Sequence, residues 1–303
     1  MSDIQNGYPG QDMTKEFIES AMEMIKNSSQ ISKDRQITVD NVFQPAFTHN
    51  RDLLLKMMDY SHLPGSHIIG VENVKKLYEL AQQGKSVIIM SEHLSNLDVP
   101  NMYARFYHEA DPIYKEIFEK FIFVAGAKLN ENDVIKVFAE MFTRVVIIPP
   151  LTTKKWEKEP EKYSNELNLA KKVNLRAIRK IIELKNKGNI FVMFPAGTRY
   201  RPWKPETKKG LKETMAYMSH FDYFCCCSIN GNNMAPNESE DMAHEKVTRE
   251  KIVLSFGDVI DAKQFSEDMM KQYNLTEDQK DEAKQVMVDE IMKKIQILHD
   301  SAD

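Results

Sequence analysis

From residue 72 onward, short apolar runs alternate with longer segments whose apolar residues recur at helical spacing. Short apolar runs bounded by turn residues are typical of strands that are buried on both faces of a sheet. The runs lie at residues 87–90, 121–125, 145–148, 190–194, 223–229 and 252–256. The helical segments lie at residues 72–83, 98–108, 132–142, 167–187, 211–218 and 278–298. This alternation predicts an α/β fold with a largely parallel sheet flanked by helices.

The N-terminal region has a different pattern. Apolar residues at helical spacing predict helices at residues 13–28 and 52–60, with a strand-like or irregular segment at 37–43 between them. A Pro-Gly pair at positions 64 and 65 marks a linker. We therefore predict a small N-terminal helical domain at residues 1–65 and an α/β domain at residues 66–303, since a chain of 303 residues is long enough for both.

Composition excludes several classes of protein. The formal net charge of −4 argues against a nucleic-acid binder, which would be basic. The three cysteines, Cys225, Cys226 and Cys227, are consecutive. Adjacent residues on a strand point to opposite faces of the sheet, so the cysteines predict neither a disulfide framework nor a metal site. They fit a reducing intracellular compartment.

The N-terminal residues contain neither a basic segment nor an apolar run, so they do not resemble a secretory signal. No apolar stretch approaches the ~18 residues that a membrane-spanning helix needs. We expect a soluble protein that at most touches a membrane surface, located in the cytoplasm or in the stroma of an organelle.

A histidine and an aspartate follow the apolar run at 87–90, with four residues between them. His93 lies on the turn after the run, which is where open α/β sheets place their functional sites. Asp98 and Pro100 predict a helix start, with Asp98 at the N-cap and Pro100 in the first turn. Asp98 is close enough to bind one imidazole nitrogen, which would leave the other free to take a proton. The alternative is that Asp98 only caps the helix and His93 is an ordinary loop residue.

A basic loop follows the run at 190–194. Its residues 195–202 begin with a Pro and a Gly that favour a tight turn, and they carry Arg199 and Arg201. The planar guanidinium of arginine suits phosphate, so two such groups on one loop predict a phosphomonoester site. The alternative is a solvated basic surface. By contrast, the acidic segment at residues 237–245 predicts a solvated excursion.

Two further groups follow strands in the same way. Lys154 and Lys155 come after the run at 145–148, and Lys128 comes after the run at 121–125, next to a glycine that allows close backbone approach. Because parallel strands end at the same edge of a sheet, we expect these blocks to converge on one rim.

Together these blocks resemble a known family. His93-Leu-Ser-Asn-Leu-Asp98, Phe123-Val-Ala-Gly126 and Phe194-Pro-Ala-Gly-Thr-Arg199, in this order and spacing, resemble the glycerolipid acyltransferases. The resemblance covers roughly residues 70 to 262 and is closest to the soluble, plastid-type glycerol-3-phosphate 1-acyltransferases, which also have an N-terminal helical domain.

The sequence departs from the family pattern at three positions. Ala196 stands where lysophosphatidate acyltransferases usually have Glu, and Trp156 replaces the histidine of the plastid-type Lys-Lys-His group. Lys128 replaces an acidic residue of the plastid-type members. These differences concern the acceptor pocket more than the pair His93 and Asp98.

The resemblance implies a mechanism without a metal or a cofactor. His93 would deprotonate the sn-1 hydroxyl of glycerol 3-phosphate, and Asp98 would orient His93, as the acid does in a serine triad. The acyl donor would be a thioester, acyl-CoA or acyl carrier protein. The residues implied to bind the acceptor phosphate are Lys155, Arg199 and Arg201, with further acceptor or donor contacts from Lys128, Lys154, Gly197 and Thr198.

The implied partners are these substrates and a membrane surface touched during product release. Two other functions remain open: a lysophosphatidate acyltransferase, and a non-catalytic phosphate- or phospholipid-binding protein on the same fold. A hydrolase is disfavoured because the sequence lacks a Gly-x-Ser-x-Gly elbow.

Overall fold

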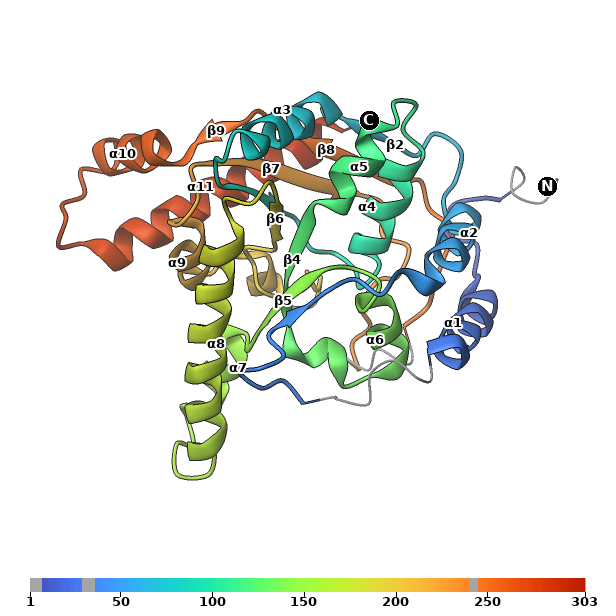
Figure 1. Ribbon diagram of the computed structural model, residues 1–303, viewed down its shortest axis with the longest axis horizontal. Coiled ribbons are helices and arrows are strands. Elements are labelled where there is room, and N and C mark those ends of the chain that lie inside the picture. Colours follow the sequence, from blue (N-terminus) through green and yellow to red (C-terminus); the bar gives the residue numbers. More distant parts are fainter. Residues whose placement is uncertain (1–6, 29–35, 240–244, 303) are drawn as a thin grey trace.

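A computed structural model of the chain describes residues 7–28, 36–239 and 245–302. Within these residues a central sheet has the strand order β1-β5-β4-β6-β3-β7-β8-β2, and β9 pairs with β7 (Figure 1). The strands are β1 (Phe43–Gln44), β2 (His67–Ile69), β3 (Val87–Ser91), β4 (Phe121–Gly126), β5 (Arg144–Ile147), β6 (Ile190–Met193), β7 (Tyr223–Asn230), β8 (Val253–Phe256) and β9 (Ile260–Asp261).

The middle of the sheet is parallel. Strands β5, β4, β6, β3 and β7 run in one direction, each parallel to its neighbour. Antiparallel pairing occurs toward the edges, where β1 pairs with β5 and both β8 and β9 pair with β7. The predicted α/β fold with a largely parallel sheet is confirmed, and the five parallel strands from β5 to β7 all end at one edge.

Helices cover both faces of the sheet (Figure 1). They are α1 (Thr14–Ser28), α2 (Arg51–Ser61), α3 (Val71–Gln82), α4 (Asp98–Tyr107), α5 (Ile113–Glu119), α6 (Asp133–Ala139), α7 (Pro150–Trp156), α8 (Ser164–Leu184), α9 (Met215–Met218), α10 (Ala262–Gln272) and α11 (Lys280–Ser301). The long predicted helices are present with shifted ends. The sequence reading missed α5, α7, α10, β2 and β9. Of these, β2 and β9 are too short for a clear period.

The core consists of two main hydrophobic clusters, one on each face of the sheet. Helices α1 to α6 contribute to the first cluster, and α8 to α11 contribute to the second. Cys225 and Cys227 lie in the first cluster and Cys226 in the second, so the expected alternation of the cysteines is confirmed. All three are buried free thiols.

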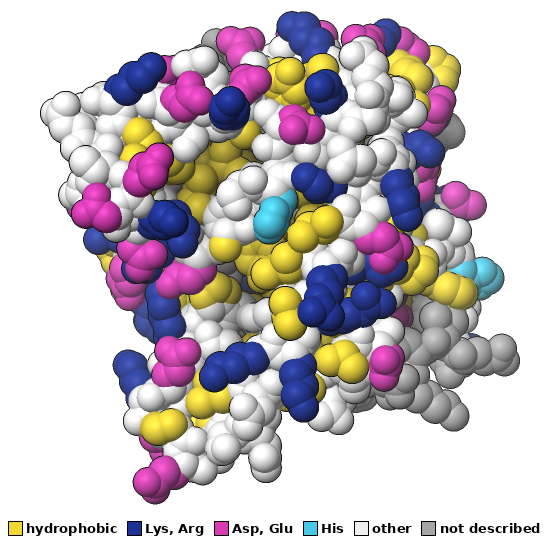
Figure 2. Space-filling model, turned by 60° about the vertical axis from the view of Figure 1, so that its left-hand side comes forward, with side chains coloured by type: hydrophobic (Ala, Val, Ile, Leu, Met, Phe, Trp, Pro, Cys, Tyr) yellow, Lys and Arg dark blue, Asp and Glu magenta, His cyan; other side chains and the backbone are white. Residues whose placement is uncertain are grey.

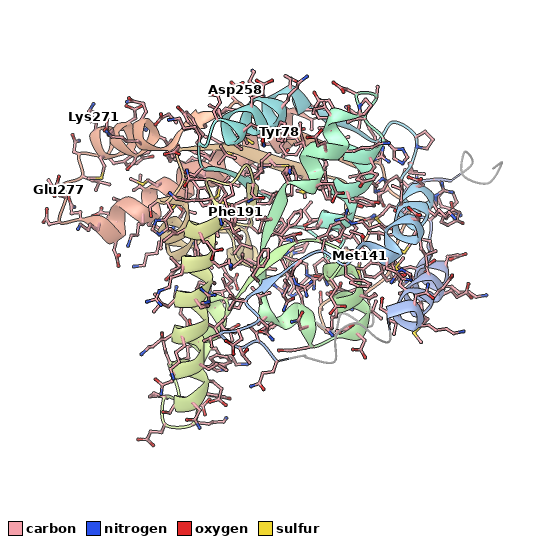
Figure 3. All side chains as sticks on the ribbon, in the orientation of Figure 1. Tyr78, Met141, Phe191, Asp258, Lys271 and Glu277 are labelled. Carbon is pink, nitrogen blue, oxygen red and sulfur yellow. The ribbon has the colours of Figure 1, made fainter. Side chains whose placement is uncertain are left out.

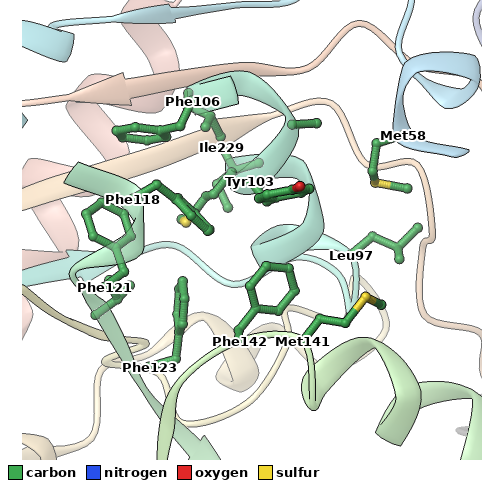
Figure 4. Packing of buried hydrophobic residues seen from close by; sticks show 14 of the residues in the cluster. Met58, Leu97, Tyr103, Phe106, Phe118, Phe121, Phe123, Met141, Phe142 and Ile229 are labelled. Atoms are coloured by element: carbon green, nitrogen blue, oxygen red, sulfur yellow. The ribbon is translucent and has the colours of Figure 1, made fainter. Parts of the chain in front are cut away.

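Aromatic rings fill much of the first cluster, between α4, α5 and the strands (Figure 4). The rings of Phe106 and Phe118 both lie against that of Phe121, at centroid distances of 5.3 and 5.1 Å. In the second cluster, Phe191 of β6 lies at the centre of the molecule, whereas Lys271 and Glu277 mark the outer end of the α10–α11 hairpin (Figure 3). Burial of such rings holds β4 beside β6, which in turn pairs with β3.

The N-terminal helices pack on the same cluster as the sheet. Phe17 of α1 stacks on Phe138 of α6 at 5.2 Å between centroids, and Leu54 and Met58 of α2 are buried in this cluster. Strand β1 pairs with β5. The separate domain at residues 1–65 stays a prediction, and the helices themselves are present as expected.

A buried polar network connects α2, α4 and the chain after β7. The His62 ring binds Asn101 Oδ1 at 2.8 Å, and Asn101 and Asn233 exchange amide hydrogen bonds of 3.0 and 2.9 Å. Burial lowers the pKa of His62 to about 3, so the ring is neutral at pH 7. This network holds the first turn of α4, the helix that begins with Asp98.

The buried His62 predicts an acid-sensitive fold. Because its pKa is about 3 in the folded chain and about 6.5 when unfolded, the unfolded state binds a proton first as the pH falls. Above pH ~6.5 His62 is neutral in both states, so the folded state keeps its full stability. Below that pH, His62 lowers the free energy of unfolding by about 1.4 kcal/mol per pH unit, or about 2 kcal/mol at pH 5. Denaturant unfolding at several pH values measures this slope.

The matched variants are His62→Gln and His67→Gln, since His67 is exposed. His62→Gln should be less stable at pH 7 but should lose less stability between pH 7 and 5 than the parent chain. His67→Gln should keep the parent slope. An equal slope in all three chains would contradict the assignment.

Candidate active site

The first and third sequence blocks meet at one edge of the sheet. Strands β3 and β6 pair in parallel with Met90 opposite Met193, so the turns that follow them start side by side. The backbone N–H of Tyr200 donates to the carbonyl of His93 at 2.8 Å. The Phe194 ring stacks on the His93 imidazole at 4.2 Å between centroids. The predicted convergence is therefore present for these two blocks.

Asp98 organises the turn that carries His93. Its Oδ2 atom lies 2.7 Å from His93 Nδ1 and also accepts from the backbone N–H groups of Leu94 and Ser95, at 2.8 and 3.0 Å. The Asp98 side chain is only 1% exposed, whereas that of His93 is 21% exposed. With Nδ1 bound to a carboxylate, the imidazole is held in the tautomer that leaves Nε2 able to accept a proton.

The expected N-cap role of Asp98 is wrong. Helix α4 begins at Asp98 itself, its N-cap is Leu97, and no side chain caps it. The reason is that the Asp98 carboxylate turns back to the N–H groups of the preceding loop instead of those of the following helix. Pro100 lies in the first turn, as predicted. A buried carboxylate at this position gains from the positive end of the helix dipole.

Glu92 and His299 are polar neighbours that the sequence reading missed. Glu92 Oε2 accepts from the N–H of Ile229 at 3.0 Å and lies 2.8 Å from His299 Nδ1. This hydrogen bond raises the pKa of His299, which lies in the last turn of α11. The contact joins the C-terminal helix to the residue before His93. In the sequence, Glu92 is distinguished only by its position next to His93. Its partner, His299, lies 207 positions away.

The third block forms a tight loop around Gly197. Gly197 has a φ of +64°, and a Cβ there would lie 2.7 Å from Leu211 Cδ1, so the position requires glycine. Arg201 Nη1 donates to Thr198 Oγ1 at 2.8 Å and to the carbonyl of Arg199 at 3.3 Å. The loop therefore holds Arg201 through its own residues.

The Arg199 guanidinium forms an ion pair with a buried carboxylate of the same chain. Its Nη1 and Nη2 donate to Oε2 and Oε1 of Glu245 at 2.7 and 2.8 Å. The Arg199 side chain is 8% exposed and that of Glu245 is 0% exposed. The predicted solvated excursion at 237–245 is wrong for Glu245, because this ion pair buries it; residues 240–244 lie outside the described residues.

The remaining basic candidates lie farther toward solvent. Lys155 on α7 and Lys128 are exposed, and Lys154 pairs with Glu213 at 2.8 Å. Figure 2 shows a face with a hollow whose walls are hydrophobic, with a histidine beside it and side chains of both charges around it. Such a face offers both positive charge and apolar surface.

Residues 7–28, 36–239 and 245–302 contain no group of three His, Cys, Asp or Glu side chains that could hold a metal ion. No helix in the same ranges is long and apolar enough to cross a membrane.

Comparison with known families identifies the chain's class. The family model described as Acyltransferase matches residues 67–229, more than half of the chain, and the match includes His93, Asp98 and Arg199. The chain belongs to the Acyltransferase family. It is an acyltransferase, so its substrates are an acyl donor and an acceptor.

One similar solved structure is the 1-acyl-sn-glycerophosphate (LPA) acyltransferase PlsC from Thermotoga maritima, at 17% sequence identity and a TM-score of 0.46. The alignment covers 93% of this chain and 94% of that one. Among curated proteins, no match is found.

The Arg199–Glu245 pair predicts a large effect on stability. Removing one partner of a buried ion pair leaves an unpaired buried charge, so Glu245→Ala should lower the free energy of unfolding by about 3–5 kcal/mol. Denaturant unfolding measures this loss. Glu238→Ala removes an exposed carboxylate of the same region and serves as the control, with an expected change within about 0.5 kcal/mol. The double variant Arg199→Met/Glu245→Leu should regain part of the loss, and equal stability of Glu245→Ala and Glu238→Ala would refute the role.

Proposed function

We propose that the protein is a glycerol-3-phosphate O-acyltransferase that moves an acyl group from a thioester to the sn-1 hydroxyl. This reaction is the first step of phospholipid synthesis. The observation that carries the proposal is the hydrogen bond between His93 Nδ1 and the buried Asp98, which prepares the other ring nitrogen as a base. The motif resemblance supports the choice of acceptor.

In the proposed reaction, His93 Nε2 takes the proton of the acceptor hydroxyl while that oxygen attacks the thioester carbonyl. Asp98 stabilises the imidazolium that forms. The tetrahedral intermediate then collapses, the C–S bond breaks, and the imidazolium returns its proton to the leaving thiolate. The substrate hydroxyl is itself the nucleophile, so the mechanism needs no nucleophilic serine.

The acceptor phosphate would be held by cations near His93, which turns a bimolecular encounter into an oriented one. On the basis of the family resemblance, we propose Lys155, Arg199 and Arg201 for this role. Further contacts are proposed for Lys128, Lys154, Gly197 and Thr198. We also propose a second role for Arg199, in which its ion pair with Glu245 fixes the loop.

The donor is proposed to be acyl-CoA or acyl carrier protein, since both present a phosphopantetheine thioester. Brief contact with a membrane would release the product. We further propose that the reaction needs no metal and no cofactor.

The second candidate is a lysophosphatidate acyltransferase, which would use the same pair on an acceptor with one acyl chain. The apolar hollow among charged side chains in Figure 2 is compatible with such a chain. Ala196 argues against it, because lysophosphatidate acyltransferases usually have Glu at this position. A non-catalytic phospholipid-binding protein would need the basic residues but not His93.

The mechanism predicts a loss of turnover in the pair variants. His93→Ala removes the general base, so kcat should fall by about a hundredfold or more. Asp98→Asn should also lower kcat, with little change in the acceptor KM. His49→Ala, at an exposed position, is the control and should match the parent enzyme. Near-parental turnover of His93→Ala would rule out the mechanism.

The acceptor is tested directly with purified enzyme, labelled glycerol 3-phosphate or lysophosphatidate, and either thioester donor. We expect product with glycerol 3-phosphate. Glycerol 3-phosphate gains its binding mainly from its phosphate, whereas each buried methylene of a lysophosphatidate chain would add about 0.8 kcal/mol. Product with lysophosphatidate alone would overturn the assignment in favour of the second candidate, and product with neither would favour a binding protein.

A further inference from the structure

A small cleft opens beside His93, between two parts of the chain. The loop after β6 contributes Tyr200, Thr207 and Lys208 to one side, and α11 contributes Met292, Ile295 and Gln296 to the other. Glu92 and His93 lie between these sides. A group bound in the cleft would therefore lie next to the proposed general base.

Lys208 is the cation of this cleft. The other basic residues considered above, Lys128, Lys154, Lys155, Arg199 and Arg201, are not among the residues that line it. In the part of the chain that the structure describes, Lys208 forms no ion pair, and its ammonium lies 5.4 Å from the centroid of the Tyr200 ring. The side chain is half-buried.

The position of Lys208 is linked to His93 through Tyr200. The Tyr200 backbone N–H donates to the His93 carbonyl, so the residue whose ring lies beside the ammonium is joined to the His93 main chain. Glu92 is the carboxylate of the cleft, and its Oε2 is bound by His299 and by the N–H of Ile229. These donors compensate the Glu92 charge, which leaves the positive charge of Lys208 available to an anion.

Arg199 is a poor competitor for this role because its charge is already used. A phosphate that took Arg199 from Glu245 would leave a fully buried carboxylate without its partner. A charged hydrogen bond to the phosphate returns less free energy than this unpaired charge costs. The balance favours a cation without a carboxylate partner.

We propose that Lys208 binds the phosphomonoester of the acyl acceptor in the cleft beside His93, and that Arg199 positions the loop through Glu245. The proposal rests on the acyl-transfer function and deepens it. It places the acceptor phosphate between the loop after β6 and α11, with the acceptor hydroxyl toward His93. Glycerol 3-phosphate and lysophosphatidate share the phosphate that this site would hold.

The test compares Lys208→Met with Lys209→Met, which removes the charge of an exposed neighbour. Loss of a charged contact should raise the KM for glycerol 3-phosphate at least tenfold in Lys208→Met. The kcat should stay within about threefold, because Lys208 does not take part in proton transfer. Inorganic phosphate should inhibit competitively with the acceptor, and its inhibition constant should rise by a similar factor in Lys208→Met. Lys209→Met should match the parent in both measurements, and Lys208→Arg should recover part of the affinity.

An unchanged KM and an unchanged phosphate inhibition constant in a folded Lys208→Met enzyme would overturn the inference. So would an equal effect of Lys209→Met, which would indicate general surface charge. If the enzyme acylates only lysophosphatidate, the same comparison is made with that acceptor, and a raised KM supports Lys208 although the proposed acceptor fails. If the enzyme acylates neither acceptor, the affinity for inorganic phosphate is measured by calorimetric titration. Weaker phosphate binding by Lys208→Met, but not by Lys209→Met, supports the site. Equal binding by the parent protein and Lys208→Met refutes it.

Discussion

One carboxylate oxygen, Oδ2 of Asp98, holds the geometry on which the site depends. It binds the imidazole of His93 and the N–H groups of the next two residues, Leu94 and Ser95. A buried charge of this kind is tolerated because several donors replace the water it has lost. The same contacts fix both the loop backbone and the orientation of the His93 ring.

The sheet supplies the second constraint. Because β3 and β6 are parallel neighbours, the turn with His93 and the loop with Arg199 start at the same edge. Buried carboxylates then connect distant segments to these turns: Glu245 binds Arg199, and Glu92 binds His299 of α11. Each contact holds an ionised or polar side chain close to the His93 turn. Loss of its partner would leave a buried polar group unsatisfied, which lowers the stability of the fold.

The sequence predicts what depends on local pattern. The run at 87–90 and the spacing from His93 to Asp98 suffice to place a turn with a His-Asp pair after a buried strand, and the alternation of the cysteines follows from strand geometry. That the Asp98 carboxylate accepts from the preceding N–H groups and does not cap α4 was not predictable, since a helix cap and a backward turn use the same residue types. Glu245 was misread for a related reason. It lies in an acidic stretch, and its partner is 46 residues earlier in the chain.

The family match and the cleft divide the site into two parts. Residues 67–229 include His93, Asp98 and the loop with Lys208, so this part of the site lies within the matched segment. The opposite wall, formed by Met292, Ile295 and Gln296, lies outside it. The proposed proton transfer is therefore assigned to residues within the segment shared with the family, whereas the width and polarity of the cleft depend on how α11 packs. Because His299 and Glu92 seat that helix, the cleft of this chain is formed in part by contacts that a family assignment alone does not describe.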